Sequence, residues 1–176
     1  MASSPRRSPT TADPTGEFPY DVVTYAFHLF AVLSRHREAA LEEAFRPLGL
    51  NLARYRALSV VARLGPLGMS ELADFSAVDR TTMTRTVDQL VSSDYVFRET
   101  PPKDRRQVLL TITTSGRAAN QQALRAVYRV NRRALESLDE ADQRQFCRMQ
   151  QVMVKNLVQD PQLARRLIEH TRDSER

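Results

Sequence analysis

The chain has 176 residues with a formal net charge of +5, 41% hydrophobic residues, 27% charged residues and one cysteine. Its composition is that of a folded globular protein, long enough for one domain or for two lobes that share a core. No apolar run approaches the roughly 20 residues that cross a bilayer, and the N-terminus lacks the pattern of a secretory signal. Cys147 has no second cysteine for an internal disulfide, which fits a reducing compartment, so we expect a cytoplasmic protein.

The N-terminal half is expected to begin with a disordered arm over residues 1–19, which are rich in serine, threonine and proline. Residues 20–45 predict a long helix whose first half, Val22–Leu33, is apolar on nearly every side and must be covered. Residues 47–50 end this helix. Asn51 is then expected to cap a second helix that runs to Leu64 and stops at Gly65 and Pro66.

Two short helices are predicted next. Ser70 is expected to cap the first, and Asp79 caps a second one, over residues 79–92, in which apolar residues recur at helical spacing. The opposite face of this second helix carries Arg80, Thr81, Thr82, Thr84, Arg85, Asp88 and Gln89. Two helices joined by so tight a turn predict a helix-turn-helix whose second helix enters a DNA major groove. We expect Thr81, Thr82, Arg85 and Gln89 to contact base edges or nearby phosphates. Ser70, Arg80 and Thr84 are further candidates for DNA binding.

Two strands are predicted over residues 95–100 and 108–112, which are rich in aromatic and β-branched residues, with Val108, Leu110 and Ile112 alternating. The loop between them, 101–107, contains Lys103, Asp104, Arg105 and Arg106. A hairpin with such a loop predicts a basic wing, with Arg105 in a minor groove and Lys103 and Arg106 at the phosphate backbone. Asp104 is expected to orient an arginine. The alternative is an ordinary solvated charged loop.

The C-terminal part, residues 114–176, is predicted to be helical. Thr113 or Thr114 caps a long helix, Asp139 starts another, and residues after Pro161 add one or two turns. One chain has too little else to cover the apolar helices at its two ends, so we infer a homodimer with two-fold symmetry. The expected domains are the arm at 1–19, a dimerisation helix at 20–48, the reading lobe at 49–113 and C-terminal dimerisation helices at 114–176.

The ordered series of capped helices, strands and basic loop resembles the MarR (multiple antibiotic resistance regulator) family of transcription factors. The resemblance covers about residues 20–160 and is carried by Asp79–Arg85, Leu90, Tyr95, Val96, Arg98, Asp104–Arg106, Leu110–Thr113 and Gly116. Asp94 stands where the family usually has glycine, at a site expected to need a left-handed backbone. The resemblance implies a mainly α-helical fold with a small β wing (α+β). It places a winged helix-turn-helix between dimerisation helices from both termini, and it implies a dimer on a palindromic operator, more often as a repressor.

The same resemblance implies that a small aromatic or anionic molecule releases the DNA. Aromatic and cationic residues on the first two helices are the candidates for holding an aromatic carboxylate, namely Tyr25, His28, Arg35, His36, Tyr55 and Arg56. The alternative role for Tyr25 and His28 is packing in a core or interface. No metal, cofactor or catalytic function is expected, because His28 and His36 are not at i, i+4 spacing and no catalytic motif is present.

The charge of the reading lobe keeps other functions open. Residues 65–113 hold six cations and seven acids, so affinity for DNA must depend on a few well-placed arginines. A winged-helix module that binds protein, a regulator without a ligand and an enzyme built on a helical dimer are the alternatives. For the enzyme no catalytic set can be named.

Overall fold

The structure, a computed structural model, describes residues 22–76, 78–101 and 107–172. It divides into two units, one ending at His36 and the other beginning at Arg37, and each is described by itself. Helix α1 (Val22–Phe45) runs through both. In the first unit its large apolar side chains are 46–52% exposed, namely Tyr25, Phe27, Leu29, Phe30 and Leu33. These are residues that the sequence analysis expects another surface to cover.

Helix α1 ends, and helix α2 (Leu52–Leu64) begins, where the sequence predicts. The 3-10 turn η1 (Arg46–Leu48) follows α1 and leads to Gly49, whose φ of 65° is the left-handed conformation that glycine adopts without strain. The side-chain oxygen of Asn51 then accepts a hydrogen bond from the backbone N–H of Arg54 at 2.8 Å. This bond satisfies one of the free N–H groups in the first turn of α2.

Helices α3 (Met69–Ser76) and α4 (Arg80–Ser92) form the predicted helix-turn-helix pair, and both pack against α2. Their inner faces share a buried core with α2 and the strands, centred on Leu58, Val61, Leu72, Met83, Val87 and Leu90. The expected cap at Ser70 is wrong, because Ser70 is the second residue of α3. The chain turns into this helix directly from a short strand that ends at Gly68, which moves the helix start forward.

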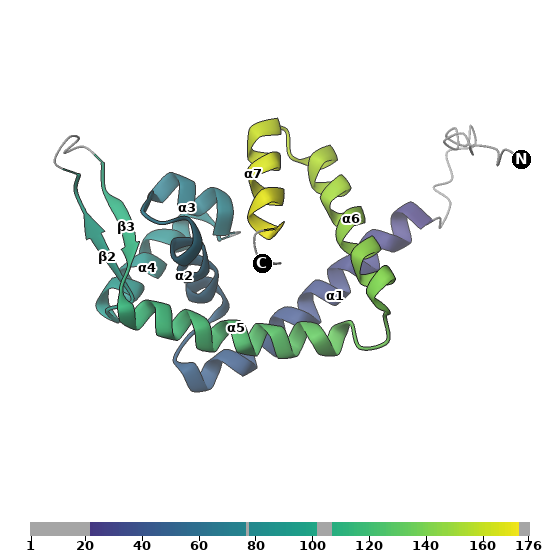
Figure 1. Ribbon diagram of the computed structural model, residues 1–176, viewed down its shortest axis with the longest axis horizontal. Helices are drawn as coiled ribbons and strands as arrows, with labels where there is room; N and C mark the ends of the chain where they lie inside the picture. The colour runs from purple at the N-terminus through teal and green to yellow at the C-terminus, as the bar shows by residue number, and fades with distance from the viewer. Residues whose placement is uncertain (1–21, 77, 102–106, 173–176) are drawn as a thin grey trace, which may run out of the picture. The chain divides into compact units, whose positions relative to one another are not determined.

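Three short strands form an antiparallel sheet in the order β1-β3-β2, in which β1 is Leu67–Gly68, β2 is Val96–Glu99 and β3 is Leu109–Ile112 (Figure 1). The hairpin of β2 and β3 was predicted, whereas β1 was not. The expected alternation is confirmed at Leu110 and Ile112, which are buried, but Val108 lies before β3 and is 44% exposed. The hairpin loop, residues 102–106, lies outside the described residues.

The segment between α4 and β2 has the predicted left-handed residue. Asp94 has a φ of 55°, a conformation that aspartate tolerates better than most residues. The carbonyl oxygen of Asp94 accepts a hydrogen bond from the Thr113 hydroxyl at 2.6 Å. The same hydroxyl accepts one from the backbone N–H of Gly116 at 2.9 Å and so caps helix α5 (Thr114–Ala134). Thr113 therefore links the end of α4 to the start of α5.

Two further helices complete the second unit, α6 (Glu140–Leu157) and α7 (Pro161–Arg172). Asp139 caps α6 as predicted, accepting a hydrogen bond from the backbone N–H of Asp142 at 2.8 Å. Helix α7 has 12 residues, so the predicted one or two turns was too short. It contacts α6, and in Figure 1 it stands between α6 and α3. Among the described residues, no helix is both long and apolar enough to cross a membrane.

Candidate nucleic-acid interface

Helix α4 presents one polar face to solvent and buries the other. Its start is fixed by Asp79, whose carboxylate accepts a hydrogen bond from the backbone N–H of Thr82 at 2.9 Å. Its outer face exposes five residues named as candidates or neighbours in the sequence analysis, namely Thr81, Thr82, Thr84, Arg85 and Asp88. The helix is therefore held firmly at its inner face while hydroxyls and one guanidinium remain accessible. The side chain of Arg80 lies outside the description.

Two of the charged side chains on this face, Asp79 and Asp88, have partners within the protein, whereas Arg85 does not pair with an acid among the described residues. Hydrogen bonds from the side chain and backbone N–H of Thr82 hold the pKa of the Asp79 carboxyl below its ordinary value, so it stays ionised. Asp88 Oδ1 pairs with Arg98 Nη2 of β2 at 2.5 Å. Arg85 makes no ion pair with any residue that the structure describes. Among the side chains of α4 that the structure describes, its guanidinium is available to an external anion.

Two arginines that the sequence analysis did not name among its site residues position this face. Arg98 connects α4 to β2 through Asp88, as just described. Arg54 of α2 donates from Nε to Gln89 Oε1 at 3.0 Å and from Nη1 to the carbonyl oxygen of Gly49 at 3.0 Å. Gln89 is thus half-buried and has its side-chain oxygen already engaged, which leaves its amide N–H groups for other contacts. No local pattern indicates these pairs, because the partners lie 10 and 35 residues apart.

The remaining candidates for DNA contact divide into described and undescribed residues. Ser70 is exposed on the first turn of α3. Lys103, Asp104, Arg105 and Arg106 all lie in the wing segment outside the described residues. The structure does describe the two strands that lead into the wing: β2 and β3 pair from Val96 opposite Ile112 to Glu99 opposite Leu109.

The candidate ligand residues fall in both units. Tyr25, His28, Arg35 and His36 are exposed on α1 in the first unit. In the second unit the ring of Tyr55 packs against Phe45, with centroids 4.8 Å apart, and burial raises the pKa of its hydroxyl. Arg56 Nη2 pairs with Glu38 Oε1 at 2.6 Å. Tyr55 and Arg56 therefore already have partners within the protein, so a ligand would have to compete for them.

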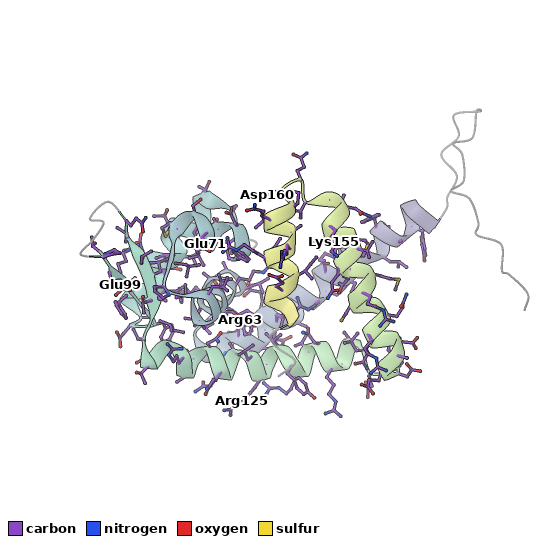
Figure 2. The ribbon with its side chains drawn as sticks, turned by 45° about the horizontal axis from the view of Figure 1, so that its top comes forward. Arg63, Glu71, Glu99, Arg125, Lys155 and Asp160 are labelled. Atoms are coloured by element: carbon purple, nitrogen blue, oxygen red, sulfur yellow. The ribbon has the colours of Figure 1, made fainter. Side chains whose placement is uncertain are left out.

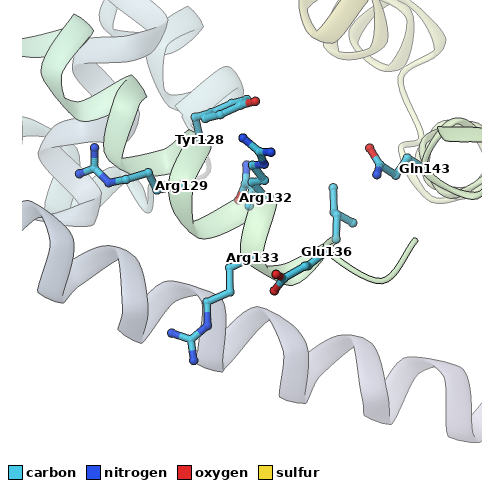
Figure 3. Close-up of a pocket in the computed structure, with 8 residues that line it drawn as sticks. Tyr128, Arg129, Arg132, Arg133, Glu136 and Gln143 are labelled. Carbon is cyan, nitrogen blue, oxygen red and sulfur yellow. The ribbon is translucent and has the colours of Figure 1, made fainter. Parts of the chain in front are cut away.

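A hollow of about 920 Å³, not foreseen from the sequence, lies at the C-terminal end of α5 (Figure 3). It is lined by Tyr128, Arg129, Asn131, Arg132, Arg133, Leu135, Glu136 and Gln143. Figure 3 shows the three arginines projecting in different directions, so their guanidinium groups do not converge on one point. The hollow is positively charged, and Tyr128, which is 63% exposed, adds an aromatic ring.

Comparisons with known proteins agree with this geometry. The sequence profile of the MarR family matches residues 50–108. Over 137 residues the chain is 28% identical to the HTH-type transcriptional repressor NicR of Pseudomonas putida. The aligned region covers 77% of this chain and 85% of NicR. Over 123 residues it is 30% identical to the HTH-type transcriptional repressor Rv2887 of Mycobacterium tuberculosis. This alignment covers 70% of this chain and 86% of Rv2887.

Solved structures have the same fold. The crystal structure of a MarR-family transcriptional regulator from Silicibacter pomeroyi superposes with a TM-score of 0.71 at 23% identity, over 80% of this chain and 94% of that one. The structure of the Mycobacterium tuberculosis MarR family protein Rv2887 in complex with p-aminosalicylic acid superposes with a TM-score of 0.61 at 25% identity. That match covers 76% of this chain and 98% of Rv2887.

Proposed function

The chain belongs to the MarR family of transcriptional regulators, and we propose that it is a homodimeric repressor that binds a palindromic operator through α4 and the wing. The observation that carries this proposal is the capped helix α4, whose outer face offers threonine hydroxyls and the guanidinium of Arg85, which pairs with no acid among the described residues. The names of NicR and Rv2887, both repressors, support repression over activation. The cytoplasm is the proposed location.

Exposed apolar surface supports the dimer. Besides the five large residues of α1, the described chain exposes apolar side chains on α5 and α6, namely Leu124, Tyr128, Met149, Val152 and Leu157. Large apolar side chains left exposed on several helices are a mark of a protein–protein contact. A two-fold dimer would place the two α4 helices about one DNA turn, roughly 34–36 Å, apart, so that each reads one half-site.

Within each half-site, we assign base-edge contacts to Thr81, Thr82 and Arg85, because these exposed side chains lie in the first two turns of α4. An arginine can bind the two acceptors of guanine at once. Gln89 can contribute only its amide N–H groups while Arg54 occupies its oxygen. Ser70, Thr84 and Arg80 are assigned to phosphates, as are Lys103 and Arg106 of the wing, with Arg105 in the minor groove and Asp104 beside it.

A small aromatic or anionic effector is the second part of the proposal. The complex of Rv2887 with p-aminosalicylic acid supports an aromatic carboxylate as the class to test. The candidates are the six residues named from the sequence and the hollow at α5, where Tyr128 can stack on a ring and Arg132 can pair with a carboxylate. Thermal shift and loss of DNA binding on titration with p-aminosalicylic acid test this. Arg132→Ala and Arg56→Ala would show which region holds it.

The decisive experiment measures fluorescence anisotropy of the purified protein on its own upstream DNA and on scrambled DNA over a salt series. Tight, sequence-dependent and salt-sensitive binding is expected for the wild type. Arg85→Ala should lose discrimination between the two DNAs, whereas Arg125→Ala, an equal change of charge on the exposed side of α5, should keep it. Absence of DNA binding even at low salt would refute the regulator and favour a winged-helix module that binds protein.

A further inference from the structure

One side chain of the last helix contacts the helix-turn-helix. The guanidinium of Arg166, on α7, pairs through Nη2 with Oε1 of Glu71 on α3. The central carbon of this guanidinium, Cζ, lies 4.7 Å from the centroid of the ring of Phe75, which is also on α3. Glu71 and Phe75 are four residues apart and so lie on one face of α3. Arg166 therefore contacts two successive turns of that helix with two different kinds of interaction.

The position of α3 bears directly on the reading helix. Leu72 of α3 is fully buried in the core that also contains Met83 and Val87 of α4, so α3 cannot shift without disturbing α4. On its other side, α7 contacts α6, and Ala164 and Ile168 of α7 are buried. Figure 2 labels Glu71 where α3 comes next to α7. Arg166 thus joins the C-terminal helices to the helix-turn-helix.

The neighbouring arginine behaves differently and supplies an internal comparison. Arg165 Nε pairs with Glu169 Oε1 of the same helix at 2.7 Å, at the i, i+4 spacing. Its contact is therefore confined to α7, whereas that of Arg166 crosses 95 residues of sequence. Arginine suits the second role because its planar group can form a salt bridge at its edge and stack on an aromatic ring with its face.

We propose that Arg166 is a positioning residue for DNA recognition. By holding α3, and through the shared core α4, it fixes the orientation of the reading helix relative to the C-terminal helices. In the dimer this sets the separation of the two α4 helices and hence the half-site spacing that the protein accepts. The inference rests on the proposed function, since it concerns binding to a two-half-site operator.

The test compares Arg166→Ala with Arg165→Ala, which removes the same charge from the adjacent position. Anisotropy gives the dissociation constant on the operator and on the same operator with one base pair inserted between the half-sites. Each base pair adds about 3.4 Å and one-tenth of a turn, so a rigid dimer should reject the longer site strongly. Arg166→Ala is expected to bind the operator about three- to tenfold more weakly and to show a smaller penalty for the insertion. Arg165→Ala should keep the wild-type penalty.

Hydrogen exchange of the backbone amides of α3 gives a readout that does not involve DNA. Exchange over residues 69–76 should increase in Arg166→Ala relative to Arg165→Ala and be partly restored in Arg166→Lys, which retains a cation for Glu71 and Phe75. Equal insertion penalties and equal α3 exchange in the two alanine variants would overturn the inference. If the wild type itself fails to prefer the operator, the proposed function fails and the spacing role falls with it. The exchange data would still show whether Arg166 restrains α3.

Discussion

Replacing Gly116 by alanine should destabilise the protein, although the same change stabilises most helices. A Cβ atom at this position would lie 2.0 Å from the carbonyl oxygen and 2.8 Å from the carbonyl carbon of Tyr95, and 2.9 Å from Cγ1 of Ile112. Two of these three neighbours are backbone atoms, so they cannot rotate away as a flexible side chain would. The first turn of α5 must therefore retreat from the segment that joins α4 to β2.

The magnitude follows from three contributions to the free energy of unfolding. Alanine in place of helical glycine normally gains about 0.5–1 kcal/mol. Forcing a methyl group into a filled site costs about 1–3 kcal/mol, and the rigid backbone neighbours favour the upper part of that range. Retreat of α5 also weakens the hydrogen bond from the Thr113 N–H to the Tyr95 carbonyl, now 3.0 Å, worth about 0.5–1.5 kcal/mol. The net expectation is a loss of about 2–3 kcal/mol, which lowers Tm by about 5–10 °C in a chain of this size.

Urea unfolding followed by far-UV circular dichroism measures this loss, and Gly68→Ala is the matched control. A Cβ at Gly68 would meet no atom within 4 Å, so that variant should stay within about 0.5 kcal/mol of the wild type. A Gly116→Ala protein as stable as the wild type, or more stable, would refute the close approach of α5 to Tyr95.

Three further predictions concern the wing, the cap of α4 and the dimer. Arg105→Ala should weaken operator binding and reduce its salt dependence by about one phosphate contact, and identical salt slopes would contradict the wing assignment. The pKa of Asp79 is lowered by its hydrogen bonds with Thr82, so its contribution to stability is present at neutral pH. It should be lost as the pH falls from about 4 through the lowered value. Asparagine can still cap the helix but cannot titrate, so Asp79→Asn should gain stability relative to the wild type in urea melts below that pH. A difference in unfolding free energy between the two proteins that does not change with pH would contradict this. Phe30→Glu, at a side chain 47% exposed on α1, should yield monomers in analytical ultracentrifugation, and unchanged dimers would exclude this face.

Helix boundaries were predictable where a cap signal is local. Asn51, Asp79, Thr113 and Asp139 each accept a backbone N–H three residues ahead, an arrangement visible in the sequence as a short polar residue before an apolar repeat. The left-handed backbone at Asp94 was predictable from the family resemblance, because glycine usually stands at that position.

Features that depend on distant partners could not be predicted. Strand β1 has only two residues and no alternation of its own, and it exists through its pairing with β3. The ion pair of Arg166 with Glu71 and the hydrogen bond of Arg54 to Gln89 join residues far apart in sequence. The partly buried setting of Tyr55 beside Phe45 likewise arises from the packing of α2 on α1, which no spacing within α2 reveals.

The balance of acids and cations in the reading lobe has a consequence for how a regulator of this kind would search a genome. Because Asp88 pairs with Arg98 and the lobe from 65 to 113 has one more acid than cations, contact with arbitrary DNA displaces fewer counterions than a broadly basic lobe would displace. Fewer molecules are then sequestered on the millions of irrelevant sites that compete with one operator. Sliding along the duplex is correspondingly shorter. A low copy number would then suffice to fill the operator, and each encounter would depend more on diffusion in solution than on travel along the DNA.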